Sequence, residues 1–257
     1  MKQYSQGGVS LGGSRHSGSS GGLLVEGARA WGFSSTAHVL MLWSIPVIIV
    51  LGAVVAALLG KPAYKWYTGE DQFAEVMQVL FYTTALIFSV LVIKELWQRD
   101  EKAIAGLYMI VLFGLTFLIG EELSWGQRIF GWETSEEFKE INKQDETNLH
   151  NVYGIGSTFK WVQMLIGAYG AILPVLLLKL PVLRNNDEFF SFVIPHFTLI
   201  PFFLPLFLWR FYRNVFDPPK DFYFVISEFN EVMEFVLAVG MALFMIFQYR
   251  RLKAGRV

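Results

Sequence analysis

Acidic side chains recur where the apolar stretches of this sequence begin or end, and their spacing groups them. At the start of the last apolar stretch, Glu228, Glu231 and Glu234 follow one another at intervals of three. On a helix such residues span an arc of about 120° and a rise of about 9 Å, so they share one face. Ionisable groups within a membrane span cost at least about 2.5 kcal/mol near its centre, and they normally point inward and pair or bind something. Glu234, the deepest, is the strongest candidate for chemistry, whereas Glu228 suits a solvated helix end.

A second group of polar residues lies in the motif GEELSWGQRIFGWE, residues 120–133. Glu121 and Glu122 are about 100° apart on a helix, so only one of them need face a helix bundle. Two glycines later in the motif permit tight turns, which would let a re-entrant or interfacial segment carry Arg128 back against the acids. We therefore expect the motif to end a helix and then fold back on it.

His150 belongs to a third motif, NKQDETNLHN, which covers residues 142–151. Its imidazole could act as an acid, a base or a metal ligand near neutral pH. It could equally be a capping or hydrogen-bonding group, and the sequence leaves both interpretations open. The other histidines fall in the N-terminal tail or toward the opposite side of the membrane, and we assign none of them to the site: His16, His38 and His196.

Together with three arginines and their neighbours, these residues define the predicted site. The candidate catalytic groups are Glu121, Glu122, His150 and Glu234. The candidate substrate-binding groups are Arg128, Arg210, Arg213, Trp125, Gln127, Asn148 and Asn151. A divalent metal ion would be held by Glu75, Glu231 and His150. Carboxylates alone favour magnesium or manganese, and a mixed set also suits zinc. We expect the acids and the imidazole to meet in one pocket, with at least one of the three arginines at its rim.

Helices that span a membrane must position these groups. The chain of 257 residues is 54% hydrophobic and only 17% charged, whereas a soluble domain carries roughly 25% charged residues. Its apolar residues form blocks long enough to cross a hydrocarbon core, which predicts an all-α, polytopic membrane helix bundle. The six predicted spans are residues 37–59, 73–96, 103–123, 158–180, 192–212 and 225–249. Prolines inside the first, fourth and fifth spans predict kinks there.

Two tails and one long connection complete the predicted organisation. Residues 1–36 are rich in Gly and Ser and predict a disordered tail, residues 37–250 form the transmembrane domain, and residues 251–257 form a basic tail. The connection at residues 124–157 carries too much apolar surface to leave in water. We expect it to fold back over the helix ends as a lid.

Orientation follows from the Lys and Arg residues in the loops, which are retained on the cytoplasmic side. If the N-terminus is inside, twelve of the 21 Lys and Arg residues fall on the cytoplasmic side and nine on the other. This bias predicts that both termini are cytoplasmic and that the candidate site lies at the extracytoplasmic face.

The two loop motifs also carry a resemblance. Residues 120–131 and 144–151 resemble the GEE-hydrophobic-SWGQRIFG and Gln-x-Glu-x-Asn-Leu-His-Asn stretches of a family of uncharacterised bacterial multi-pass membrane proteins. The family is also similar in an acid near the start of the second helix, here Glu75, and in acids opening the last helix, here Glu231 and Glu234. The resemblance covers most of the membrane domain and implies that these residues belong together, but it implies no reaction.

Alkaline ceramidases, which use acids, a serine and several histidines around zinc, are a poor match. This chain has six predicted spans rather than seven, and its last span lacks a His-x-x-x-His pattern. A zinc site made by three histidines therefore cannot be carried over.

Composition limits the remaining functions. A net charge of −1 argues against a nucleic-acid partner, and the absence of cysteine excludes disulfides and thiolate chemistry. One hypothesis is a membrane-embedded enzyme, with or without a divalent metal, that acts on a lipid-linked or amphipathic substrate. A second is a non-catalytic subunit or lipid-binding scaffold whose acids and arginines form an ion-pair lattice. A third is a proton-coupled or cation-coupled transporter, which polar groups confined to one half of the membrane disfavour. Membrane lipids are the expected partners, and the oligomeric state stays open.

Overall fold

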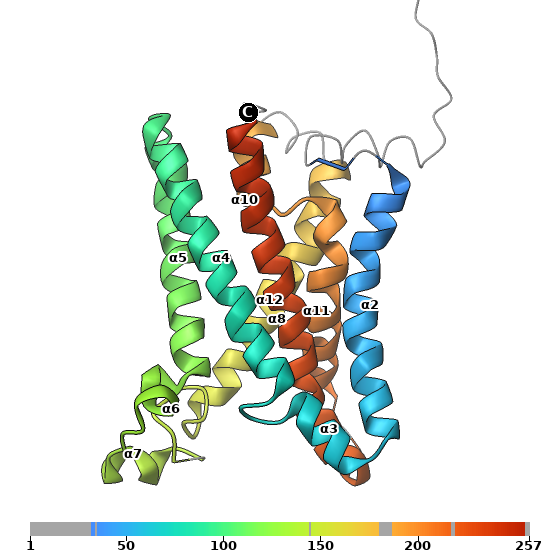
Figure 1. Ribbon diagram of the computed structural model, residues 1–257, viewed down its shortest axis with the longest axis vertical. Coiled ribbons are helices and arrows are strands. Elements are labelled where there is room, and N and C mark those ends of the chain that lie inside the picture. Colours follow the sequence, from blue (N-terminus) through green and yellow to red (C-terminus); the bar gives the residue numbers. More distant parts are fainter. Residues whose placement is uncertain (1–31, 34, 144, 180–186, 217–218, 255–257) are drawn as a thin grey trace, which may run out of the picture.

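The computed structural model of the chain describes residues 32–33, 35–143, 145–179, 187–216 and 219–254. It confirms the predicted all-α, multi-pass helix bundle, with six helical segments long and apolar enough to cross a membrane (Figure 1). The long helices are α2 (Thr36–Leu58), α4 (Phe73–Gln98), α5 (Lys102–Glu122), α8 (Ile155–Lys179), α11 (Ile200–Val215) and α12 (Tyr223–Lys253). The predicted tail at residues 1–36 lies almost wholly outside the described residues, as do residues 255–257 of the predicted basic tail.

Short helices join the long ones at both ends of the bundle. They are α3 (Lys61–Thr68), η1 (Ser124–Gly126), α6 (Gln127–Phe130), α7 (Glu136–Ile141), α10 (Asp187–Val193), η2 (Phe197–Leu199) and η3 (Lys220–Phe222), where η marks a 3₁₀ helix. The start of α2 and the end of α12 lie at one end of the bundle, and α3, α6 and α7 lie at the other (Figure 1). An even number of crossings therefore places both of these helix ends on the same side.

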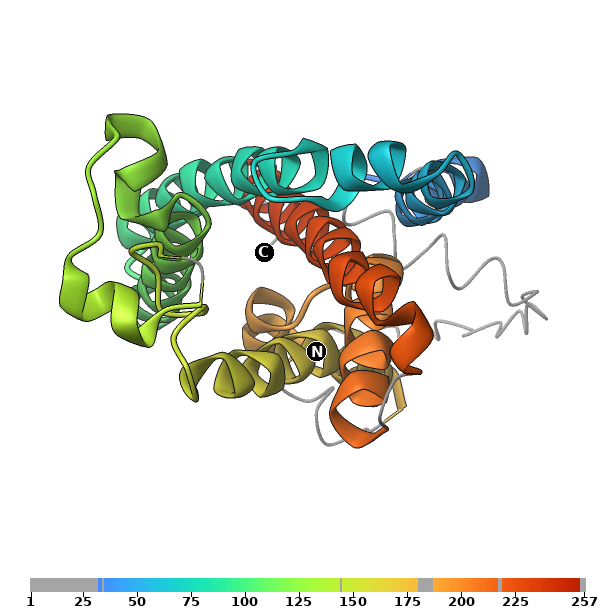
Figure 2. The ribbon, with the colours of Figure 1, turned by 90° about the horizontal axis from the view of Figure 1, so that it is seen from below.

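The last helix, α12, forms the centre of the bundle. Its most apolar window is 78% buried, whereas the corresponding windows of the other five segments are between 22% and 44% buried. Seen from below, α12 runs between α4 on one side and α8 and α11 on the other (Figure 2). Its polar residues Asn230 and Glu234 are buried and are consequently surrounded by protein rather than by lipid.

The predicted fifth span is broken rather than kinked. The chain leaves α10 near Pro195, passes through η2 and enters α11, with Pro201 in the first turn of that helix. Carbonyl groups freed at membrane depth need donors from the protein. Side chains of four other helices provide them. Gln248 donates to the Ser191 carbonyl and Tyr108 to the Phe192 carbonyl. Tyr169 donates to the Val193 carbonyl and Trp43 to the Thr198 carbonyl. In contrast, α2 and α8 continue through their internal prolines, Pro46 and Pro174.

The connection between α5 and α8 folds against the helix ends, but its apolar side chains do not form the expected cover. Trp125 and Gly126 adopt positive φ angles of 52° and 95°, which reverse the chain directly after α5. Ile129 and Phe130 are 63% and 75% exposed. Because the loop lies at the level where the spans end, these side chains suit the membrane interface. Polar contacts, together with packing of the Trp125 ring on Phe117 and Gly120, hold the loop in place.

Candidate active site

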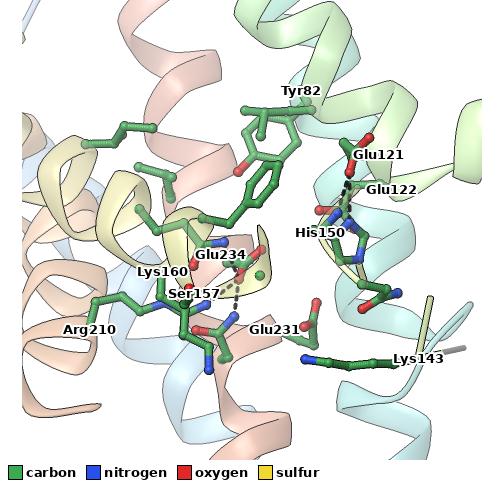
Figure 3. Close-up of a pocket in the computed structure, with 18 of the residues that line it drawn as sticks. Tyr82, Glu121, Glu122, Lys143, His150, Ser157, Lys160, Arg210, Glu231 and Glu234 are labelled. Carbon is green, nitrogen blue, oxygen red and sulfur yellow. Dashed lines mark hydrogen bonds and ion pairs between the residues drawn. The ribbon is translucent and has the colours of Figure 1, made fainter. Parts of the chain in front are cut away.

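A cavity of about 370 Å³ lies between α4, α5, α8, α11 and α12, beside the loop that precedes α8. Figure 3 shows the polar side chains gathered around it. The predicted site residues that line it are Glu121, Glu122, His150, Asn151, Arg210, Glu231 and Glu234. The expectation that acids from separate helices meet the single loop histidine therefore agrees with this arrangement.

Glu121 and His150 form a carboxylate–imidazole pair at one side of the cavity (Figure 3). The Glu121 side chain is 3% exposed, and one of its oxygens accepts hydrogen bonds from the backbone N–H groups of Leu149 and His150 at 2.7 and 2.8 Å. The same oxygen lies 3.3 Å from Nδ1 of His150. A carboxylate in this position orients the ring and favours the proton on Nδ1. Nε2, which has no hydrogen-bond partner among the described residues, is then the basic atom.

Glu234 anchors the opposite side of the cavity. One of its oxygens accepts hydrogen bonds from the side chains of Gln163 at 2.8 Å and Arg210 at 3.3 Å, and also from the Asn230 amide. The Glu234 and Arg210 side chains are only 11% and 7% exposed. A buried carboxylate and guanidinium compensate one another, so this pair is a fixed part of the cavity wall.

Two further carboxylates lie between these pairs. Glu231 accepts a hydrogen bond from Gln78 at 3.0 Å, whereas Glu122 forms no hydrogen bond or ion pair within the described chain. Both line the cavity. Glu122 experiences the negative charges of Glu231 and Glu234. The cavity therefore contains acidic groups that no lysine or arginine contacts directly.

Arg128 forms a separate cluster beside the cavity. Its guanidinium contacts the carboxylates of Asp71 at 2.8 Å and Glu146 at 2.9 Å and forms an ion pair with Glu75. Burial lowers the pKa of Arg128, but the charges of Glu75, Glu146 and Asp71 more than offset this and raise its pKa above the usual value. A small cavity of about 140 Å³ adjoins this cluster and shares Glu122 with the larger one. Glu75 thus lies outside the main cavity, in contrast to our expectation of a single pocket.

Besides Arg128, four predicted substrate-binding residues lie outside the cavity lining and hold the loop or helix ends. Trp125 donates a hydrogen bond to Glu121 at 2.7 Å, and the Gln127 side chain accepts one from the backbone N–H of Thr147 at 2.7 Å. Asn148 donates to Glu146 at 2.6 Å, and Arg213 donates to the Ile226 carbonyl at 2.8 Å. Residue spacing could not foresee that the polar atoms of these side chains would be taken up by partners in the protein, two of them carboxylates and two of them backbone groups.

The three tentative metal ligands are not brought together. Glu75 pairs with Arg128, Glu231 binds Gln78, and His150 contacts Glu121. Across the part of the chain that the structure describes, no three His, Asp or Glu side chains are grouped so that they could hold one metal ion. The cavity instead combines an oriented imidazole with carboxylates and cationic side chains, which are the group types that proton transfer and the binding of a charged ligand require.

Several cavity residues were missed by sequence reasoning. They are Tyr82, Lys143, Ser157, Lys160, Gln163 and Asn230. Some signals were available: Tyr82 lies one helical turn after Gln78, and Gln163 is a polar residue inside an apolar span, three residues after Lys160. Lysines close to a helix end, however, look like ordinary solvated residues in a sequence. Their position beside the acids emerges only from the fold.

The fold and the cavity together define a class: a multi-pass membrane helix bundle with a polar cavity at one membrane face. The chain matches no known family model, no curated protein and no solved structure.

Proposed function

We propose that this protein is a membrane-embedded enzyme that cleaves or transfers an ester bond of an amphipathic or lipid-linked substrate. The observation that carries the proposal is the Glu121–His150 pair beside a cavity of about 370 Å³. Ligand cavities in proteins commonly have volumes of about 300 to 1,000 Å³. An oriented imidazole with one unpartnered nitrogen in such a cavity is suited to general base catalysis.

The proposed ester cleavage or transfer needs only the side chains of His150 and Glu121, with a water molecule or an acceptor hydroxyl as the nucleophile. Nε2 of His150 would take a proton from a water molecule or an acceptor hydroxyl, whose oxygen attacks the acyl or phosphoryl centre of the substrate. As the bond to the leaving oxygen breaks, the imidazolium returns the proton to that oxygen, so the enzyme is regenerated. Glu121 would stabilise the imidazolium throughout, as the carboxylate does in serine hydrolases.

An activity assay with matched variants tests this proposal. Purified protein in lipid is given a panel of fluorogenic amphipathic esters, both acyl and phosphoryl. We expect His150→Gln to lower kcat/KM by about 100-fold or more, the usual contribution of a general base. His38→Gln changes an exposed histidine at the far end of the bundle and should leave the rate unchanged. Equal rates for wild-type and His150→Gln protein, or no turnover of any ester, would overturn the proposal.

The scaffold hypothesis has its own supporting observation. Glu75, Glu121 and Glu234 each accept hydrogen bonds from at least one donor, as expected of a structural lattice. Against it, a purely structural lattice offers no reason for a cavity or for a carboxylate such as Glu122 without a direct partner. The enzyme proposal accounts for both features.

The transporter hypothesis draws support from the broken fifth span. Discontinuous helices form the substrate sites of many transporters. Here, however, the carbonyls of Ser191 and Phe192 at the end of α10 already accept hydrogen bonds from Gln248 and Tyr108. This break is consequently better explained as a packing feature.

The orientation and the family relationship belong to the same proposal. The loop charge bias favours termini on the cytoplasmic side, which would place the cavity at the extracytoplasmic face, in contact with lipids of the outer leaflet. The resemblance to bacterial multi-pass membrane proteins rests on the GEELSWGQRIFG and NLHN motifs. Contacts between those motifs, from Glu121 to Leu149 and His150, support their acting as one functional unit.

A further inference from the structure

Two lysines on the cavity wall, Lys143 and Lys160, form no ion pair with its carboxylates among the described residues. Lys143 lies with its ammonium 5.6 Å from the ring centroid of Tyr153, and neither Lys143 nor Lys160 forms an ion pair within the described part of the chain. Lys160 also experiences the positive charges of Lys143 and Arg210. Arg210 is neutralised by Glu234, but the two lysines have no ion-pair partner of their own, so this part of the cavity is suited to an anionic group.

A second part of the cavity has the opposite charge. Glu122 and Glu231 are close enough to affect one another electrostatically. The two arginines near enough to act on these acids electrostatically already form ion pairs with other carboxylates. Arg128 pairs with Glu75, and Arg210 pairs with Glu234. A cationic group between Glu122 and Glu231 would offset their repulsion and could donate hydrogen bonds to both.

Buried polar atoms on the same wall also lack partners. Arg210 and Asn230 are 5% and 8% exposed and line the cavity, yet Nε of Arg210 and Oδ1 of Asn230 form no hydrogen bond within the described residues. Buried polar atoms of this kind are rare in proteins, and a bound ligand or ordered water is a common explanation. These two atoms are an observation independent of the charged groups.

The rest of the wall is apolar. Leu118, Phe159, Ile166 and Leu237 complete the lining. A ligand that fills the cavity therefore meets separate anionic, cationic and apolar surfaces within about 370 Å³. A free ion would satisfy only one of these three surfaces.

From this layout we infer that the cavity binds an amphiphile with a zwitterionic head group, whose phosphate contacts Lys143 and Lys160 and whose primary ammonium contacts Glu122 and Glu231. The inference rests on the proposed function, since it names the substrate class of the same cavity. Phosphatidylethanolamine has this chemistry, and so does free phosphoethanolamine without the apolar chains.

Binding selectivity tests the inference directly. Wild-type protein in detergent micelles is titrated with short-chain phosphatidylethanolamine, with phosphatidylglycerol of the same chain length, and with free phosphoethanolamine. We expect phosphatidylethanolamine to bind at least about tenfold more tightly than either of the others. Equal affinity for phosphatidylglycerol would show that the acids bind no ammonium and would overturn the inference. Equal affinity for phosphoethanolamine would remove the role of the apolar wall.

Variants assign the two halves of the head group. Glu231→Gln should weaken phosphatidylethanolamine binding by about tenfold and leave phosphatidylglycerol binding unchanged or stronger. Lys160→Gln should weaken both lipids. The matched controls are Glu137→Gln and Lys139→Gln on α7, which lie outside the cavity and should change neither affinity. A Glu231→Gln variant that weakens both lipids equally would contradict the assignment of the ammonium, and Glu122→Gln, which removes the other acid assigned to the ammonium, provides the same comparison if Glu231→Gln does not fold.

Binding and turnover are read from the same samples, which separates the two proposals. If esters are cleaved but phosphatidylglycerol is preferred, the enzyme proposal stands and the zwitterion inference fails. If phosphatidylethanolamine binds selectively and no ester is cleaved, the inference stands and the proposed catalysis fails.

Discussion

Glu121 holds His150 through two contacts, accepting a hydrogen bond from its backbone N–H at 2.8 Å and lying 3.3 Å from its Nδ1 atom. Because the same oxygen also accepts from the backbone of Leu149, it ties the end of α5 to the loop that precedes α8. The imidazole is therefore positioned from the helix end. Its neighbour Glu122 has no such partner within the described chain.

The two adjacent acids should respond differently to the same substitution. We expect Glu121→Gln to lower the free energy of unfolding by about 2 to 4 kcal/mol, because an amide has one acceptor oxygen and would leave buried N–H groups unpaired. Glu122→Gln should change it by less than about 0.5 kcal/mol, since no hydrogen bond is lost. Denaturant titration in mixed micelles, followed by circular dichroism, measures both. Equal losses would mean that the hydrogen bonds to Glu121 do not contribute to stability.

The fold was largely predictable because hydropathy and length dominate a membrane protein. The break in the fifth span was not, because Pro195 alone permits either a kink or an interruption, and the outcome depends on donors such as Tyr108 and Gln248 on distant helices. The site was predictable only as a set of acids at one level. Which acid pairs with which cation, for example Glu75 with Arg128, depends on how the loop turns at Trp125. Residue spacing does not reveal the direction of that turn.

Two glycines on α5 offer a matched test of that turn. A Cβ added at Gly120 would lie 2.9 Å from the Trp125 ring, whereas one added at Gly114 would meet nothing within 4 Å. We expect Gly120→Ala to destabilise the protein by about 1 to 3 kcal/mol, the usual cost of overpacking. Gly114→Ala should be neutral or stabilise the helix by up to about 1 kcal/mol. Thermal unfolding monitored by tryptophan fluorescence would measure both, and a Gly120→Ala protein as stable as Gly114→Ala would show that the ring is free to move.

The broken fifth span predicts a specific role for a tyrosine hydroxyl. Tyr108 is 3% exposed and donates to the Phe192 carbonyl at 2.7 Å. Tyr108→Phe leaves that carbonyl without this donor and should cost about 1 to 3 kcal/mol. The control is Tyr153→Phe, where the ring is 62% exposed and the loss should be below about 0.5 kcal/mol. Similar stabilities for the two variants in a denaturant titration would argue that the break needs no donor from Tyr108.

Orientation is tested by reporter fusions. If the termini are cytoplasmic, alkaline phosphatase fused after Val257 should be inactive, and the same enzyme inserted within residues 135–143 should be active. A green fluorescent reporter at each position should give the reverse pattern. Phosphatase activity after Val257 would place the cavity at the cytoplasmic face.

Arg128 should be among the most important residues for stability, because its side chain, 16% exposed, serves three carboxylates from two parts of the chain. Arg128→Met leaves Glu75, whose side chain is 9% exposed, without its cation, and breaking a buried pair in this way costs about 3 to 5 kcal/mol. Lys139→Met, which removes an ion pair with the exposed Glu136, should cost less than about 1 kcal/mol.

The double variant Arg128→Met with Glu75→Gln identifies the cause of that loss. If the penalty comes from an uncompensated buried charge, removing the charge should recover about 0.5 to 3 kcal/mol relative to Arg128→Met alone. If the arginine acts mainly by holding the loop through Glu146 and Asp71, the double variant should be no more stable than the single one. Arg128→Lys keeps the positive charge but loses the planar, multidentate geometry, so it should fall between wild type and Arg128→Met. Denaturant titrations of wild type and the four variants in one detergent give the comparison. An Arg128→Met protein as stable as Lys139→Met would mean that the cluster contributes nothing to the fold.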